Sequence, residues 1–236
     1  MKNILVITAH PDDLEMSCGG SVAKWVSEGY NVINLLLVPN VSHGDYLPDA
    51  QKHLGYEVVA LPVNRERLSI TPELVADVEH HFLDTEFETI VTHWKEDWHQ
   101  EHQACYSLGR ILARKQPCQL WYMSSHPYHL KYREFSPDIY VDITSHVHLK
   151  YRAMSEYKNI TSQWEIGVKS HDSWRGSFIN VKKAEVFQAA GGIHQLMRGH
   201  FNRDGETVGG GAGVNATIVH QGHFDLVEHD CDTTAV

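Results

Sequence analysis

The segment NILVITAHPDD (residues 3–13) decides the fold, because it joins an apolar run directly to a polar turn. Residues 3–8 form a nearly continuous apolar stretch, which is typical of a strand buried on both faces of a sheet. Residues 17–28 then carry apolar side chains at helical spacing and stop before Gly29, a residue type that favours helix ends. A second apolar run follows at residues 32–38. Strand, helix and strand within about forty residues predict a βαβ unit and a parallel sheet.

The same alternation continues to about residue 190. The expected strands are residues 58–61, 88–93, 119–123 and 139–143, and the expected helices are residues 72–83, 99–115, 146–158 and 180–190. Thr71 is a suitable N-cap for the first of these helices, and residues 39–55 are loop-rich with one short helical stretch. We therefore expect an α/β protein with a Rossmann-like, doubly wound, mostly parallel sheet and helices on both faces.

The end of the chain differs in composition from the rest. Residues 204–213 read DGETVGGGAG, and only weak alternation follows them. A length of 236 residues fits one large domain with or without an appendage. We expect a domain over residues 1–200 and a glycine-rich extension over residues 201–236, whose role the sequence does not define.

Charge and composition exclude several classes of partner. The formal net charge of −10 repels nucleic-acid phosphates and acidic membranes. No apolar run approaches the roughly 18 residues of a membrane span. The first residues, MKNILVITAH, are too short for a signal peptide and lack a small-residue cleavage site, so we expect a cytoplasmic protein. The four cysteines form no CxxC pair, which argues against a disulfide framework.

The first chemical signal is the turn that follows residues 3–8. His10 and Asp13 lie three residues apart there, so both can face one point, and both residue types are normal zinc ligands. Pro11 stiffens the turn. Asp12 would point to the other side of the metal and could take a proton from a bound water. The alternative is that Asp12 and Asp13 cap the following helix. The position after a buried strand favours a site, because strand ends form the active-site crevice of such sheets.

The second signal is the pair His99 and His102, at the start of a predicted helix after another strand. Their spacing lets both side chains reach one site. A catalytic zinc needs three protein ligands and one open position, so His10, Asp13 and one histidine of this pair complete a set. The other histidine would serve acid–base or oxyanion chemistry, and spacing does not decide which is which. The alternative for the pair is a solvated helix face.

Four segments together resemble a known family: AHPDDLE with Gly-Gly at residues 19–20, EDWHQEH (96–102), YVDIT (140–144) before a helix, and RGSFINVKKAEVF (175–187). They are similar to the PIG-L/LmbE-like deacetylases, which include GlcNAc-phosphatidylinositol, mycothiol-precursor and antibiotic-sugar de-N-acetylases and small bacterial relatives. The resemblance runs from residue 1 to about residue 190. The first two segments are specific to the family, and the other two are supportive.

The resemblance implies the LmbE-like form of the fold and a role for each site residue. It implies His10, Asp13 and His102 as zinc ligands, Asp12 as general base, and His99 as the group that polarises the carbonyl. The expected enzyme is a zinc-dependent N-deacetylase that removes an acetyl or other acyl group from an amino sugar or a sugar-containing metabolite. Fe²⁺ or another divalent metal suits the same ligands. Self-association is also expected, because many relatives self-associate.

The expected chemistry is the hydrolysis of an amide by zinc-activated water. Asp12 accepts the proton of the attacking water, zinc and a protonated His99 stabilise the oxyanion, and Asp12 or His99 protonates the leaving amine. Glu101 replaces the Asp that the family usually has before its last ligand, and could still orient a histidine. Residues 40–55 also lack the Arg-x-x-Glu pair that is frequent in the family.

Aromatic side chains near the expected site suit stacking on a sugar ring. They are Trp94, Trp98, Trp121, Tyr122, His126, Tyr128 and His129. The alternative for Trp121 and Tyr122 is a place in the core. Arg175 could contact an anionic substrate group or be a surface charge.

The sequence also suggests three alternative functions. An amidase that acts on a non-sugar N-acyl substrate would use the same site. A catalytically silent metal- or sugar-binding protein would have no need for both Asp12 and His99. A nucleotide-binding Rossmann domain is excluded, because the first turn lacks GxGxxG and its two carboxylates would repel phosphates.

Overall fold

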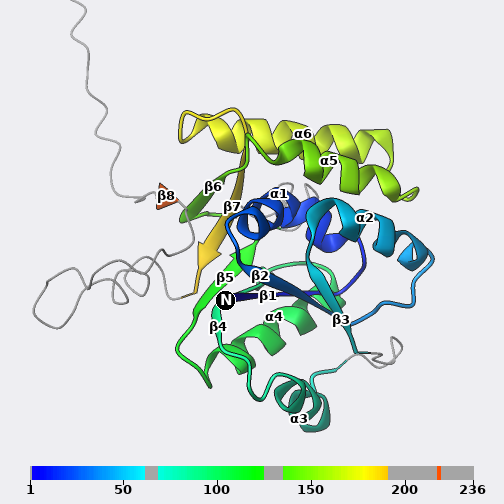
Figure 1. Ribbon diagram of the computed structural model, residues 1–236, viewed down its shortest axis with the longest axis vertical. Coiled ribbons are helices and arrows are strands. Elements are labelled where there is room, and N and C mark those ends of the chain that lie inside the picture. Colours follow the sequence, from blue (N-terminus) through cyan, green and yellow to red (C-terminus); the bar gives the residue numbers. More distant parts are fainter. Residues whose placement is uncertain (1, 62–68, 125–134, 191–216, 219–236) are drawn as a thin grey trace, which may run out of the picture.

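The strands form one mixed sheet. The computed structural model describes residues 2–61, 69–124, 135–190 and 217–218. The strands are β1 (Asn3–Thr8), β2 (Asn31–Leu36), β3 (Glu57–Ala60), β4 (Phe87–His93), β5 (Gln119–Met123), β6 (Ile139–Asp142), β7 (Ala184–Ala189) and β8 (Thr217–Ile218). Their order in the sheet is β3-β2-β1-β4-β5-β7-β6-β8 (Figure 1). β1 to β5 pair in parallel, whereas β7 runs antiparallel to β5 and β6. The expected mostly parallel α/β sheet is confirmed.

Helices cover both faces of this sheet, as expected for a doubly wound fold (Figure 1). They are α1 (Asp13–Ser27), α2 (Leu47–Leu54) after a 3-10 turn (Gly44–Tyr46), α3 (Pro72–His81), α4 (Gln100–Ala113), α5 (Val147–Glu156) and α6 (Ser162–Ser177). One core lies between the sheet and α1, α2 and α5, and includes the fully buried Trp25. A second core on the opposite face packs Val78 of α3 and Leu108 of α4 against β1 and β2. Thr71 caps α3 as predicted, because its hydroxyl accepts a hydrogen bond from the Leu74 N–H.

The central strands are buried because helices cover both of their faces. Residues 4–7 of β1 are fully buried, and β2 and β4 are nearly so. This explains why their sequences read as continuous apolar runs rather than alternating ones. β3 is the edge strand and stays partly exposed. At the other edge β8 pairs with β6, so two residues of the glycine-rich extension belong to the sheet.

Two predictions near the end of the domain were wrong or incomplete. Residues 180–190 are not a helix, because Ala184–Ala189 forms β7 between β5 and β6. The charged Glu185 made this strand look amphipathic, but its side chain is buried against Lys150. The sequence pattern predicts no element over residues 162–177, which form α6. This helix buries few apolar side chains, so its periodicity is weak. Tertiary contacts override local preference in both places.

Helix α1 begins four residues earlier than predicted, at Asp13, and is kinked. Cys18 has non-helical angles (φ −143°, ψ 18°), so the helix restarts after it. The freed N–H groups of Gly20 and Ser21 donate to the Glu185 carboxylate at 3.0 and 2.6 Å. Gly29 ends the helix as predicted, with a left-handed φ of 89°. Within the described part of the chain, no helix is both long and apolar enough to cross a membrane.

Candidate active site

The site lies where the strand order reverses. From β1 the chain builds outward through β2 to β3, then returns to the other side of β1 as β4 (Figure 1). The segments after β1 and β4 therefore begin side by side at the carboxyl ends of two neighbouring parallel strands. In open α/β sheets, ligands usually bind in the crevice at such a switch point. These two segments carry the predicted site residues His10, Asp12, Asp13, His99 and His102.

The structure brings the three expected ligands together. His10, Asp13 and His102 each offer a ligand atom, and these atoms all lie within 4.8 Å of one another. Asp13 Oδ1 is 3.2 Å from His102 Nε2, and Asp13 Oδ2 is 3.4 Å from His10 Nδ1. Oδ2 also accepts hydrogen bonds from the backbone N–H groups of Ala9 and His10, at 3.2 and 2.7 Å. The turn itself thus holds the carboxylate in place.

Two further carboxylates orient the histidines. Asp97 Oδ2 is 2.8 Å from His102 Nδ1, so Nε2 of that ring is left facing Asp13. Glu101 Oε2 is 2.5 Å from His10 Nε2, so Nδ1 of that ring is left facing Asp13. The carboxylate–histidine pairs fix which nitrogen can bind a metal. The expected orienting role of Glu101 agrees with this geometry. Asp97 was missed, although it lies inside the EDWHQEH segment.

The helix-cap alternative for the two aspartates is correct for the position of Asp12 but not for a capping hydrogen bond. Asp12 occupies the N-cap position of α1, but among the described residues its side chain makes no cap hydrogen bond. The Asp13 carboxylate turns back to Ala9 and His10 instead of capping the helix. Both carboxylates are therefore available for a site.

Asp12 contacts two residues that the sequence did not suggest. Its Oδ2 accepts a hydrogen bond from Asn159 Nδ2 at 2.7 Å, and its Oδ1 lies 3.4 Å from His43 Nε2. His43 lies between β2 and α2, and Asn159 lies between α5 and α6. Neither belongs to a recognisable motif, so only the folded chain reveals the contacts.

His99 caps α4 and faces the solvent more than the other site histidines. Its Nδ1 accepts a hydrogen bond from the Glu101 N–H at 3.3 Å, and 45% of its side chain is exposed. Partial burial and the neighbouring His102 and His10 lower the pKa of His99 below its usual value. Because Nδ1 accepts that hydrogen bond, the neutral form of the ring carries its proton on Nε2. The protonated His99 of the expected mechanism stays a prediction, and the lowered pKa favours the neutral ring.

His93, at the end of β4, is a further member of the cluster. Its ring stacks on His102 with centroids 3.8 Å apart, and its Nε2 lies 3.4 Å from Asp13 Oδ2. Complete burial lowers the pKa of His93 to about 4, so it is neutral. Burial also lowers the pKa of His102, but Asp13 and Asp97 outweigh this and raise it to about 10. The sequence did not indicate His93 as a site residue, because it is the last residue of an apolar strand.

The aromatic residues divide into core and surface. Trp94, Trp121 and Tyr122 are buried, so for the last two the core alternative is correct. Trp98 is 62% exposed beside His99. His126, Tyr128 and His129 lie outside the described residues. Arg175 is neither a surface charge nor an open anion site, since it is 3% exposed and donates to the Phe135 carbonyl oxygen at 3.4 Å.

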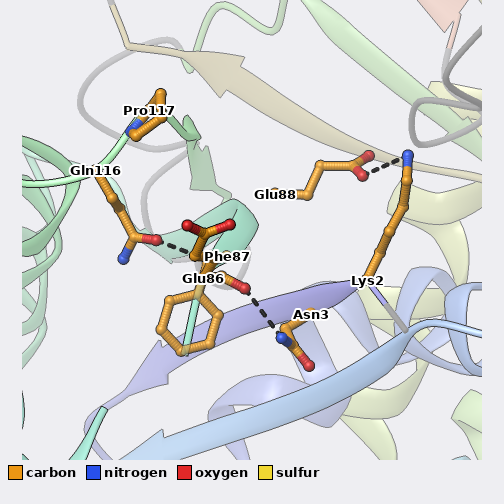
Figure 2. A pocket seen from close by; sticks show the side chains of 7 residues that line it. All are labelled: Lys2, Asn3, Glu86, Phe87, Glu88, Gln116 and Pro117. Atoms are coloured by element: carbon orange, nitrogen blue, oxygen red, sulfur yellow. Dashed lines mark hydrogen bonds and ion pairs between the residues drawn. The ribbon is translucent and has the colours of Figure 1, made fainter. Parts of the chain in front are cut away.

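A cavity lies at the opposite ends of these strands, where β1 and β4 begin (Figure 2). Lys2 Nζ pairs there with Glu88 Oε2 at 2.6 Å, and Asn3 Nδ2 donates to the Glu86 carbonyl oxygen at 2.9 Å. The Gln116 side chain accepts a hydrogen bond from the Phe87 N–H. Lys2, Asn3 and Gln116 thus each have a partner among the residues that line this cavity. The candidate active site is therefore the one at the switch point.

The fold and the site define a class: a Rossmann-like α/β protein with a histidine–aspartate centre at its switch point. No family model matches the chain. The uncharacterized deacetylase YaiS of Escherichia coli (strain K12) is 30% identical over 135 residues, which span 51% of this chain and 73% of the relative. The chain therefore belongs to the LmbE/PIG-L-type deacetylase family.

Two solved structures share the fold. N,N′-diacetylchitobiose deacetylase from Pyrococcus horikoshii is 18% identical with a TM-score of 0.66, and covers 80% of this chain and 84% of its own. GalB, the 4-carboxy-2-hydroxymuconate hydratase of Pseudomonas putida KT2440, is 19% identical with a TM-score of 0.69, and covers 80% and 96%. One fold thus occurs in a deacetylase and in a hydratase, so the reaction has to be argued from the site.

Proposed function

We propose that this protein is a divalent-metal-dependent N-deacetylase that acts on an N-acetylated sugar or a sugar-containing metabolite. One observation carries the proposal: His10, Asp13 and His102 converge on one point, and Asp12 stands beside them in the same turn. A ligand set with a separate carboxylate next to it is what metal-assisted hydrolysis of an amide requires.

The donor atoms suit a resident metal. Two imidazole nitrogens and a carboxylate oxygen form a common catalytic zinc set, and Fe²⁺ fits the same ligands. The side chains of His10, Asp13 and His102 keep 10–12% of their surface exposed, so the set is not sealed from solvent. The neighbouring group His93, Asp97 and His102 also clusters, but His93 is fully buried and Asp97 is 1% exposed. A catalytic centre needs an open position, so the first group is favoured.

In the proposed reaction the metal would supply Lewis acidity and lower the pKa of a water molecule bound to it. Asp12 takes the proton of the water that attacks the amide carbonyl and passes it to the departing amine nitrogen. His99 Nε2–H donates a hydrogen bond to the carbonyl oxygen as negative charge develops there. A neutral His99 suffices for this role.

Two observations support the proposed substrate class: the family of the chain and an exposed aromatic side chain near the site. The chain belongs to a deacetylase family, and the structurally similar Pyrococcus enzyme is a deacetylase of N,N′-diacetylchitobiose. The exposed indole of Trp98, next to His99 in the chain, offers a flat face on which a sugar ring can stack. Zinc as the resident metal and an amino sugar as the substrate are parts of the same proposal.

An acetate-release assay tests the proposal. The panel contains N-acetylglucosamine, N,N′-diacetylchitobiose, nucleotide-linked and glycosidic N-acetyl sugars, and N-acetylated amino acids as non-sugar amides. We expect release from at least one sugar, loss of release after chelation, and recovery on adding Zn²⁺ or Fe²⁺. Release from the amino acids alone would identify a non-sugar amidase. Chelator-resistant release, or no release across the panel, would refute the proposal.

A further inference from the structure

We propose that Asn159 and His43 are positioning residues for Asp12, and that they hold its carboxylate in the orientation that proton transfer requires. This inference rests on the proposed function, because it assumes that Asp12 is the general base. The two residues would orient the Asp12 side chain, which the HPDD turn alone does not do. Asn159 has the main role and His43 the secondary one.

The first step concerns what holds Asp12. Asp13 is fixed by two backbone N–H groups of its own turn, whereas Asp12 makes no cap hydrogen bond to the described part of α1. An aspartate side chain has several accessible rotamers. A base has to stay within about 0.5 Å of its productive position, so an outside support is needed. The two contacts of Asp12 both come from other segments of the chain.

Asn159 is well placed to give this support. Its Nδ2 donates to Asp12 Oδ2 at 2.7 Å, which leaves Oδ1 as the oxygen that can accept a proton. Two residues earlier, the buried Tyr157 donates its hydroxyl to the Pro11 carbonyl oxygen. The segment between α5 and α6 therefore forms hydrogen bonds to two successive residues of the turn, to the backbone of Pro11 and to the side chain of Asp12. This double contact fixes Asn159 relative to the base.

His43 approaches Asp12 from a different segment. Its Nε2 lies 3.4 Å from Asp12 Oδ1, and its ring packs edge-on against Tyr157 with centroids 6.5 Å apart. The following residue, Gly44, approaches the Pro39 carbonyl oxygen so closely that a Cβ atom would lie 2.4 Å from it. This tight turn restricts where His43 can lie. Asn159 thus holds Oδ2 by a hydrogen bond, whereas His43 Nε2 faces Oδ1 without forming a hydrogen bond to any described residue. Tyr157 contacts the His43 ring and lies two residues before Asn159.

Removing Asn159 should lower the rate of the reaction, because Asp12 would lose its orientation. Misplacing a catalytic group by about 1 Å can cost up to a hundred-fold in rate. Asn159 is exposed, so truncating it removes no core packing and leaves the fold intact. We expect Asn159→Ala to lower kcat about ten- to a hundred-fold, with KM changed less than about two-fold and the metal content unchanged.

A double-mutant cycle separates positioning from a general structural role. It compares wild type, Asn159→Ala, Asp12→Ala and the double variant, assayed on N,N′-diacetylchitobiose or on a faster sugar from the panel. A residue that acts through Asp12 has nothing left to do once Asp12 is gone. We therefore expect Asn159→Ala to change kcat by less than about two-fold in the Asp12→Ala background. Lys158→Ala, a neighbouring exposed residue, is the matched control and should keep wild-type kcat.

A second pair of variants tests His43. His43→Phe keeps a ring that can pack on Tyr157 but removes the nitrogen that faces Asp12, whereas His43→Gln places a polar amide there. We expect a several-fold loss of kcat in the first variant and partial recovery in the second. Crystal structures of metal-loaded wild type and Asn159→Ala add a readout that needs no substrate, because the Asp12 carboxylate should leave its wild-type rotamer.

The outcomes are distinguishable. Full activity in Asp12→Ala, or no sugar turnover in wild type, would refute the proposed function. A slow Asp12→Ala with a normal Asn159→Ala, or an unchanged Asp12 rotamer, would overturn the positioning role. A loss of kcat on removing Asn159 that persists at full size in the Asp12→Ala background would overturn it as well.

Discussion

At the scale of single residues, Asp13 organises the site. Its largely buried carboxylate, 12% exposed, is surrounded by His10, His93 and His102, which hold its pKa well below the usual range although burial alone would raise it. Asp97 and Glu101 then occupy the outer nitrogens of two of these rings. Carboxylate oxygens and imidazole rings thus lie close together at one place, where a metal cation could interact with them.

Asp12→Ala tests the role of the base. A positioned acid–base group is worth about a hundred- to ten-thousand-fold in rate, so kcat should fall by that factor. The metal content should stay at the wild-type value, because Asp12 is not one of the proposed ligands. Elemental analysis and acetate release measure the two quantities. His102→Ala is the contrasting variant and should lose the metal itself. Near-normal turnover in Asp12→Ala would contradict the assignment.

Asp97→Asn tests the support of His102. The substitution keeps the shape of the side chain but weakens its hold on His102 Nδ1. Loss of such an outer partner typically costs about 10–100-fold in metal affinity. Competition with a metal-binding dye measures this. Glu96→Gln, at the neighbouring surface position, is the control and should bind the metal as wild type does. Equal affinities for the two variants would show that Asp97 does not support the ligand.

The sequence predicted part of this residue-scale picture. His10, Asp12, Asp13, His99 and His102 stand out because they cluster at strand ends with ligand spacing. His93 could not be found, since it ends a buried strand. His43 and Asn159 could not be found either, because each is a single polar residue in a separate loop. Only the packing of those loops brings them to Asp12.

At the scale of elements, a buried charge network shapes α1. Lys150 Nζ lies 2.7 Å from Glu185 Oε1 and 3.0 Å from Asp172 Oδ1, and all three side chains are buried. Glu185 also accepts the N–H groups that the kink at Cys18 sets free. The anion stands at the start of the second half of the helix, where the helix dipole favours it. The first half carries Asp13 into the site.

Lys150→Met tests this network. Removing the cation leaves two buried carboxylates without a counter-charge, which should cost about 3–5 kcal/mol of unfolding free energy. Urea unfolding followed by circular dichroism measures the change. Lys169→Met removes a partly exposed partner of Glu165 on α6, and should cost at most about 1 kcal/mol. Equal losses of unfolding free energy in the two variants would show that burial does not determine how much an ion pair contributes to stability.

The same network explains why sequence patterns failed locally. β1, β2 and β4 are predictable because both of their faces are apolar. β7 carries the buried Glu185, and α6 carries the buried Asp172 and Arg175. Polar residues in interior positions break the periodicity on which prediction depends. Such residues are identified only once their partners, which come from distant segments, are known.

At the scale of the whole molecule, the fold sets where chemistry can occur but not which chemistry. The switch point between β1 and β4 would exist for any residues in those turns. The same architecture occurs in a hydratase, so side chains carry the difference. Self-association and the role of residues 201–236 stay predictions that light scattering on the full chain and on a chain ending at residue 200 would test.

The most direct test is a metal titration of the metal-free protein on an N-acetylated sugar that the wild-type enzyme cleaves. Acetate release should rise in proportion to added metal and level off at about one equivalent per chain, as expected for a single three-ligand centre. His10→Ala, Asp13→Ala and His102→Ala should each fail to bind metal tightly and fail to recover activity. Full activity of the metal-free protein, or metal-restored activity in all three variants, would contradict a metal centre built from these residues.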